Sequence, residues 1–185
     1  GQPCPMNMSQ WRQYCENLQL SIEDAEKIRY LIMKPKHWVD WHREATRVFT
    51  SDPENFAINQ KMSLQTTNKG ALIESRWKVT DIRFTDTYFE IEFLSIGQYR
   101  MEKPVGGGVD SQKICFTVVT SDNSGLEITS TWRYKGWGKL FKKNIRQIIE
   151  MQIRHLLEDL QNDIKKRKSS GLFMEHVGMN HHEQE

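Results

Sequence analysis

The sequence predicts an α+β fold in which an antiparallel sheet packs against one long helix at the C-terminal end. Two patterns support this prediction: apolar residues recur at helical spacing between Phe141 and Ile164, and the segment from Glu44 to Arg133 reads as short strands. The links between these strands have the length of turns. Parallel strands would need long crossovers, so the sheet is expected to be antiparallel.

The C-terminal helix is expected to follow Gly136-Trp137-Gly138 and to run without interruption to Lys168. At 1.5 Å per residue it would span roughly 45 Å. A helix cannot bury so wide an apolar face by itself, so a large partner must cover it. Space between that partner and the helix is where a function could lie. The expected apolar stripe consists of Phe141, Ile145, Ile148, Ile149, Ile153, Leu156, Leu160 and Ile164.

The first third of the chain predicts two short helices. Ser21 resembles an N-cap with acidic residues in the first turn behind it, and this helix must stop before Pro35. A second short helix is expected over Pro35–Trp41, because proline is tolerated at a first helical position. The preceding segment Arg12–Leu20 fits a first strand and a helix starting at Ser9 about equally well.

The middle of the chain predicts about six strands, separated by turn signals such as Asp52-Pro53 and Asp122-Asn123-Ser124-Gly125. Residues 104–110, which carry three consecutive glycines, are expected to form a loop. We expect one domain over residues 9–170, a disordered segment over 1–8 and a flexible polar tail over 171–185. The expected strands are Ala45–Thr50, Phe56–Thr66, Ala71–Phe84, Thr87–Phe93, Ile114–Thr120 and Leu126–Arg133.

The composition excludes several classes of protein. The 185 residues carry a net charge of +2, whereas a dedicated nucleic-acid-binding protein is usually far more basic, so we expect no nucleic-acid partner. No run approaches the ~20 apolar residues of a transmembrane segment. The three cysteines, an odd number without a CxxC pair or a secretion signal, indicate reduced thiols in a cytoplasmic protein.

Four segments resemble a known superfamily. Residues 21–28 (Ser-Ile-Glu-Asp-Ala-Glu-Lys-Ile) are similar to the start of its first helix, and residues 34–41 (Lys-Pro-Lys-His-Trp-Val-Asp-Trp) to a short helix that ends near tryptophan. Residues 77–82 look like a middle strand, and residues 125–132 like the last strand before the terminal helix. Over roughly Gln10 to Lys168, the chain resembles the START-like (SRPBCC, helix-grip) superfamily, in particular its polyketide cyclase/dehydrase-like branch.

This resemblance implies a curved antiparallel sheet of about six to seven strands, wrapped around the C-terminal helix, with two short helices after the first strand. It also implies an apolar cavity between sheet and helix that binds a lipid, a sterol or a polyketide-like molecule. The leading hypothesis is therefore a non-catalytic protein that binds or transports a hydrophobic small molecule. We expect such a binding protein to need no cofactor.

Two other functions stay open. One is a cyclase/dehydrase-type enzyme, for which Arg76, Asp81, His42 and Gln152 are the candidate acid/base or polar groups. The other is a protein-interaction module of the kind found in the co-chaperone branch of the superfamily. A homodimer is compatible with each of the three hypotheses.

Most of the candidate ligand-binding residues are aromatic, since ligand pockets are mostly apolar. For any one of them, ordinary core packing is the more common role. The candidates on the predicted strands and on the terminal helix are Trp77, Phe89, Phe93, Phe116, Trp132 and Phe141.

The polar candidates are fewer. Gln152 falls on the apolar stripe of the terminal helix, where a buried amide must find a partner or cost about 1–3 kcal/mol. It could bond a ligand carbonyl or hydroxyl, or simply a neighbouring backbone group. Ser130 and Thr117 could present hydroxyl groups from strands, although a solvated strand face is the more common role for them.

His37, Trp38, Trp41 and His42 form a dense group around the second short helix. They either close one mouth of the cavity or pack that helix onto the sheet. No third ligand with suitable spacing accompanies the two histidines, so we expect no metal site here.

Two groups remain near the C-terminus. The basic run Lys165–Lys168 suits the negative end of the helix dipole, and weak contact with an anionic membrane surface is the functional alternative. His176, His181 and His182 lie in the polar tail and are expected to be solvated.

Overall fold

The computed structural model describes residues 10–171, and within this range eight strands form one antiparallel sheet. Its strand order is β1-β8-β7-β5-β4-β3-β2, with β6 paired to β5 beside this path. The strands are β1 (Trp11–Gln19), β2 (Ala45–Thr50), β3 (Lys61–Asn68), β4 (Ala71–Phe84), β5 (Tyr88–Arg100), β6 (Lys103–Val105), β7 (Val109–Val119) and β8 (Gly125–Tyr134).

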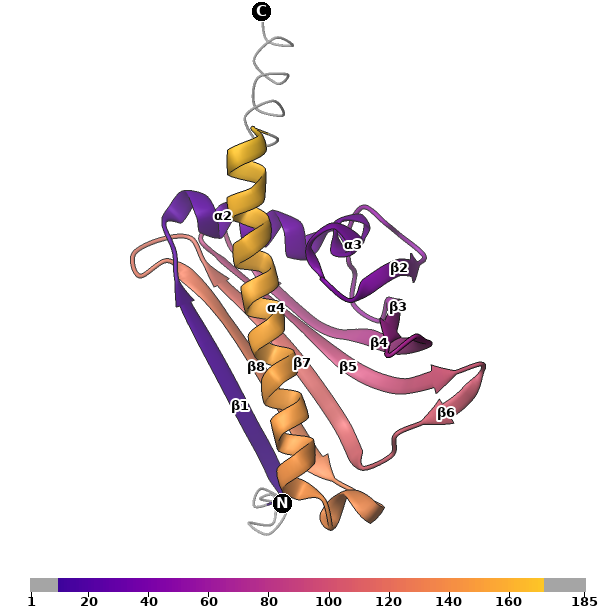
Figure 1. The fold of residues 1–185 in the computed structure, drawn as a ribbon. Coiled ribbons are helices and arrows are strands. Elements are labelled where there is room, and N and C mark those ends of the chain that lie inside the picture. The colour runs from indigo at the N-terminus through magenta and orange to yellow at the C-terminus, as the bar shows by residue number, and fades with distance from the viewer. Residues whose placement is uncertain (1–9, 172–185) are drawn as a thin grey trace, which may run out of the picture.

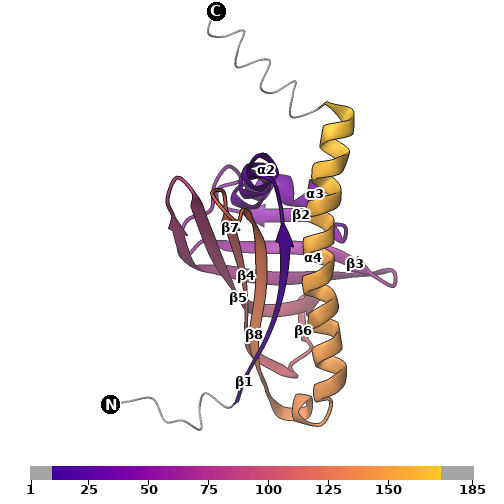
Figure 2. The same cartoon turned by 90° about the vertical axis from the view of Figure 1, so that its left-hand side faces the viewer.

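The helices lie on one face of this sheet (Figures 1 and 2). They are α2 (Ile22–Met33), the 3₁₀ turn η1 (Pro35–His37), α3 (Trp38–Trp41), a second 3₁₀ turn η2 (Gly136–Lys139) and α4 (Lys142–Ser170). In the side view the sheet bends so that β2 and β3 reach toward α4, which makes the helix-covered face concave (Figure 2). The predicted α+β class, with two short helices after the first strand, is confirmed.

β1 settles the choice between strand and helix at the start of the chain. All nine of its residues pair with β8, from Trp11 opposite Arg133 to Gln19 opposite Gly125. The local pattern could not decide this, because the stabilising partner lies more than 100 positions away in the sequence. The second N-terminal prediction also holds: Ser21 Oγ accepts a hydrogen bond from the Asp24 backbone N–H at 3.1 Å and caps α2.

The strand boundaries differ from the expected ones most at β3, β5, β6 and β7. β7 begins at Val109 rather than Ile114, so it takes up the end of the expected 104–110 loop. β3 begins at Lys61 rather than Phe56, because Phe56 is a buried loop residue. β5 continues past Phe93 to Arg100, beyond the predicted end. Its last residues pair with the short β6, which was expected to be part of the glycine-rich loop.

α4 starts later than expected, and its apolar stripe is narrower. The side chains of Ile145, Ile149 and Ile153 are buried, and the stripe continues through Leu156, Leu160 and Ile164. Ile148, by contrast, is 68% exposed, and Phe141 is the N-cap residue at 50% exposure. The sheet and the other helices cover α4 from one side, so residues at the margin of the predicted stripe stay in solvent.

The core beside α2 and α3 is aromatic. The ring of Trp38 lies 4.7 Å from that of Trp41 and 5.3–5.8 Å from those of Phe56, Phe93 and Phe116, centroid to centroid. Most of these ring pairs meet edge to face, a geometry that adds about 0.5–1.5 kcal/mol per pair beyond burial. The Trp38 indole donates a hydrogen bond to the carbonyl of Ile32 at 3.0 Å. The aromatic group therefore packs the short helices onto the sheet.

The C-terminal basic run is partly used by the fold itself. Lys168 Nζ lies 2.6 Å from Asp24 Oδ1 on α2, and Arg167 pairs with Asp163 at 2.6 Å and with Asp40 at 3.5 Å. These ion pairs hold the end of α4 against the short helices. Among the described residues, no helix is long and apolar enough to cross a membrane.

Close backbone contact fixes η2 against the loop between β6 and β7. The Lys135 amide donates to the Gly108 carbonyl at 3.0 Å. A Cβ atom placed on Gly138 would lie only 1.9 Å from that same carbonyl oxygen. Position 138 therefore accepts glycine only, unless the backbone moves.

We expect Gly138→Ala to lower the free energy of unfolding by about 1–3 kcal/mol, the usual cost of overpacking. Urea unfolding, followed by circular dichroism, measures this change. The exposed neighbour Lys139→Ala serves as the control and should leave stability within about 0.5 kcal/mol of the wild type. Equal stability of the two variants would contradict the close contact.

Candidate functional site

The concave side of the sheet is packed at one end and partly polar further along. Near α2 and α3, the predicted site residues Trp38, Trp41, Phe93 and Phe116 are all at most 3% exposed, so they are core in this structure. Phe89, at 2% exposure, is core as well. Within the histidine–tryptophan group around α3, the two tryptophans are thus buried and His37 and His42 are half-buried.

A polar chain crosses from sheet to helix farther along α4. Gln152 Oε1 accepts a hydrogen bond from Gln112 Nε2 at 3.0 Å, and the same Nε2 lies 3.4 Å from Ser130 Oγ. Ser130 is fully buried and donates its own proton to the carbonyl of Lys113 at 3.0 Å. The structure therefore joins two of the predicted site residues, Gln152 and Ser130, through a third that was not predicted.

Gln112 owes its position to an irregularity in β7. The pairing of β7 with β8 shifts register between Asp110 and Lys113, and Ser111 within this shift has φ = +55°. A bulge re-aims the side chains of the residues that it contains. Neither periodicity nor composition marks Gln112 in the sequence; the positive φ of a serine is a property of the folded chain.

One buried donor beside this chain has no partner. Trp132 lies two residues after Ser130 on the same face of β8 and is fully buried, yet its indole Nε1–H makes no hydrogen bond. Trp41 Nε1–H, at the other end of the interior, is also without one. A buried donor without an acceptor costs about 1–3 kcal/mol, so such groups call for an explanation.

The helix surface next to Gln152 is apolar and open to solvent. Ile148 precedes Gln152 by one turn, and Met151 lies between them at 52% exposure. Residues three and four apart share one side of a helix, so these two side chains border the polar chain. Trp77, at 6% exposure, belongs to β4 on the concave side, where it pairs with Met62 of β3. Phe141 is exposed at the start of α4 and contacts Trp137.

The candidate acid/base residues do not converge. Arg76 pairs with Glu74 at 2.8 Å and stacks on the Tyr99 ring, and Asp81 pairs with Arg83 at 2.9 Å. His42 follows α3, and its Nδ1 accepts from the Glu44 amide at 3.3 Å. None of these groups bonds to Gln152, so the described residues do not assemble them into one reaction site.

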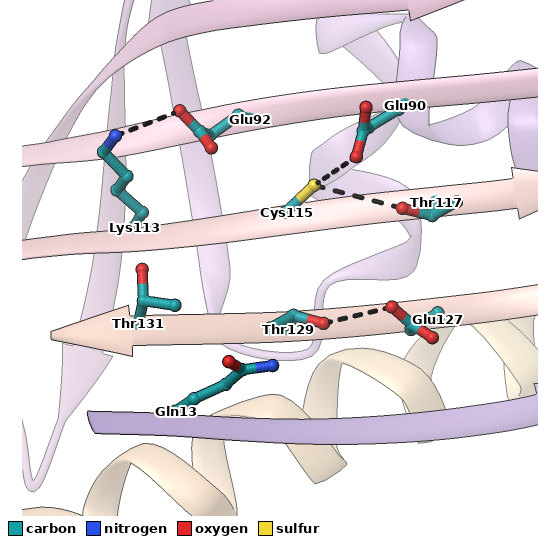
Figure 3. A pocket seen from close by; sticks show the side chains of 9 residues that line it. All are labelled: Gln13, Glu90, Glu92, Lys113, Cys115, Thr117, Glu127, Thr129 and Thr131. Atoms are coloured by element: carbon teal, nitrogen blue, oxygen red, sulfur yellow. Dashed lines mark hydrogen bonds and ion pairs between the residues drawn. The ribbon is translucent and has the colours of Figure 1, made fainter. Parts of the chain in front are cut away.

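One shallow pocket lies on the opposite, convex face of the sheet (Figure 3). It has a volume of about 270 Å³. Figure 3 shows its side chains rising from β1, β5, β7 and β8, with Lys113 Nζ 3.3 Å from Glu92. The lining residues are Gln13, Glu90, Glu92, Lys113, Cys115, Thr117, Glu127, Thr129 and Thr131.

The surroundings of the thiol in this pocket favour its protonated form. Cys115 Sγ donates to Glu90 at 3.5 Å, and burial, together with the nearby carboxylate, raises the pKa of the Cys115 thiol to about 12. A thiol that stays protonated is a poor nucleophile. No group of three or more histidine, cysteine, aspartate or glutamate side chains within residues 10–171 could hold a metal ion.

Solved structures share this fold. Ginseng major latex-like protein 151 from Panax ginseng matches with a TM-score of 0.61 and 9% identity, over 85% of this chain and 97% of that one. Ara h 8.0201 gives a TM-score of 0.62 at 9% identity, over 84% and 99% of the two chains. The di-domain ARO/CYC StfQ from the steffimycin biosynthetic pathway gives 0.61 at 14% identity, over 89% of this chain and 54% of that chain.

No family model matches the sequence. Neither does any curated protein. The structural matches, at low identity, show the fold alone: the protein has the helix-grip fold that the sequence predicted.

His42 makes stability depend on pH. Burial lowers the pKa of His42, while Asp159 and Glu44 raise it and Arg43 lowers it further. As pH falls below about 6.5, His42 is protonated in the unfolded chain before it is protonated in the folded protein. The free energy of unfolding therefore decreases as pH falls from about 6.5 through the pKa of His42 in the folded protein. We expect His42→Gln to flatten the dependence of unfolding free energy on pH between about 7 and 5.

Urea unfolding at several pH values measures this slope. The matched control is His155→Gln, a half-buried histidine on α4. A slope that stays the same in His42→Gln would show that His42 does not resist protonation in the folded state.

Proposed function

We propose that the protein binds and carries a hydrophobic small molecule between the concave face of the sheet and the N-terminal half of α4. The observation that carries this proposal is the polar chain of Gln152, Gln112 and Ser130 between the sheet and α4, next to the exposed apolar side chains of Ile148 and Met151. Small-molecule sites combine such apolar walls with a few fixed polar groups.

The polar chain suggests the kind of ligand. The carboxamides of Gln112 and Gln152 can each donate and accept, so they suit a hydroxyl or a carbonyl on an otherwise apolar molecule. An acceptor on the ligand could also satisfy the unpartnered indole N–H of Trp132. Lipids, sterols and polyketide-like molecules share this chemistry. We propose no catalytic step, because the acid/base candidates lie apart.

The fold comparison supports the proposal in a general way. One of the similar structures is an ARO/CYC from a biosynthetic pathway, so this fold accommodates chemistry on small organic molecules in another protein. The odd cysteine count also leads us to propose that the protein works in the cytoplasm, where thiols stay reduced.

The first test is direct. Native mass spectrometry of the purified protein should reveal a co-purified lipid-like mass, or the apolar fluorophore 1-anilinonaphthalene-8-sulfonate should bind with micromolar affinity or better. We expect Ile148→Asp to weaken binding of this fluorophore about tenfold, because it replaces an apolar contact of the proposed site with a charge. A loss of about 1.4 kcal/mol in binding free energy, comparable to the burial of one apolar side chain, corresponds to this tenfold change.

Ile22→Asp is the matched control, since Ile22 is an exposed isoleucine at the start of α2 and away from the proposed site. It should bind the fluorophore as the wild type does. The proposed function is refuted if no bound mass is found and the fluorophore does not bind. It is also refuted if Ile148→Asp and Ile22→Asp weaken fluorophore binding equally.

A second variant tests the polar chain. Gln152→Leu should weaken binding of a hydroxyl- or carbonyl-bearing ligand, such as cholesterol or a long-chain fatty alcohol, by up to about tenfold relative to a plain hydrocarbon analogue, because one hydrogen bond contributes about 0.5–1.5 kcal/mol. Thr129→Val, a comparable polar-to-apolar change on the convex face, is the control. An equal effect on both ligands would remove the polar chain from the recognition site.

A further inference from the structure

One end of the molecule carries a basic pocket. It lies where η2 leads into α4 beside the start of β1, at the end opposite α2 (Figures 1 and 2). Its volume is about 380 Å³. Five basic side chains and one carboxylate line it, and that carboxylate, Asp110, is already paired with Arg133 at 2.6 Å. The lining residues are Gln10, Arg12, Asp110, Arg133, Tyr134, Lys135, Gly136, Lys139 and Lys142.

Large apolar side chains that neighbour these lining residues in the sequence are open to solvent. Leu140, directly after the pocket residue Lys139, is 82% exposed, and Trp137 and Phe141 are each 50% exposed. The rings of Trp137 and Phe141 lie 6.0 Å apart, and the Leu140 amide donates to the Trp137 carbonyl at 3.0 Å. These residues therefore form one compact apolar projection. Contact of Gly138 with Gly108 holds this projection in a fixed position on the sheet.

The positive charge at this end does not stabilise α4. The first turn of α4 carries Lys142 and Lys143 and no acidic residue, although the positive end of the helix dipole favours anions there. The basic run at the other end of α4 differs, because Arg167 and Lys168 pair with carboxylates of α2, α3 and α4. Excess positive charge thus gathers at the end where folding alone would disfavour it.

We propose that this end of the protein docks on an anionic phospholipid bilayer. Leu140, Trp137 and Phe141 enter the interface between headgroups and acyl chains, where tryptophan is favoured. Lys135, Lys139, Lys142 and Lys143 contact the lipid phosphates around them. Attraction of basic residues to anionic lipid adds to apolar insertion, as in other surface-bound proteins.

The apolar projection favours a membrane over a nucleic acid. Base stacking uses aromatic faces, whereas the most exposed residue of the projection is the aliphatic Leu140. The proposal does not depend on a ligand inside the protein, and its test uses vesicles rather than a cavity ligand. Failure of one proposal therefore leaves the other standing.

The experiment is vesicle flotation of the full chain with phosphatidylcholine vesicles that contain 30% phosphatidylglycerol, compared with phosphatidylcholine alone. We expect binding to the anionic vesicles that weakens with added salt. Lys139→Glu/Lys143→Glu should lower the partition coefficient at least about tenfold, because each charge near the surface contributes roughly fivefold.

The matched control is Lys165→Glu/Lys166→Glu, which changes the charge equally at the other, also exposed, end of α4. It should keep most of the binding. Wild-type protein that stays unbound at low salt, or equal losses in both double variants, would overturn the proposal. Thermal unfolding of each variant confirms that it is folded.

Insertion is tested separately with brominated phosphatidylcholine in the anionic vesicles, which quenches tryptophan fluorescence at the interface. The wild type should be quenched. Trp38, Trp41, Trp77 and Trp132 are buried, but Trp11 is 37% exposed, so the comparison is made in a Trp11→Phe background, where Trp137→Phe should lose most of the quenching. Leu140→Ser should bind several-fold more weakly. Quenching unchanged in Trp137→Phe, or a single-stranded oligonucleotide that binds the wild type more tightly than the vesicles do, would refute membrane docking.

Discussion

The apolar stripe of α4 is the constraint on which the rest of the structure depends. A 29-residue helix with one buried stripe needs a cover along its whole length, and no single flat element supplies it. β1 and β8 cover the first part, while α2 and α3 cover the last. The sheet must therefore curve, and the short helices must sit beside one end of it.

The aromatic group around Trp38 makes the packing under α4 denser at the end near α2 than at the other end. Trp38 ties the end of α2 to the sheet through the Ile32 carbonyl and through its ring contacts. That end of the interior becomes dense core. The polar side chains of Gln152 and Ser130 meet between α4 and the sheet nearer the start of α4, beside solvent-exposed Ile148. The proposed small-molecule site and a packed core thus occupy different parts of one concave face.

The two ends of α4 also differ in charge. Near the packed end, carboxylates on α2, α3 and α4 pair with Arg167 and Lys168 at the end of α4. At the other end of α4, basic side chains line a pocket close to exposed Leu140 and Trp137. The proposed interior site lies closer to this second, basic and apolar end.

The sequence by itself determined what depends on neighbours along the chain: most of the α4 stripe, the Ser21 cap, and the strand predicted over Thr87–Phe93. Their periods and caps act within a few residues, so a local pattern suffices. Only the tertiary structure decided that Trp11–Gln19 is a strand, that Ile148 is exposed, and that Gln152 meets Gln112 across a bulge. Each of these depends on a partner distant in sequence. The basic pocket has the same origin, since its residues come from β1, β7, β8, η2 and α4, which only folding brings together.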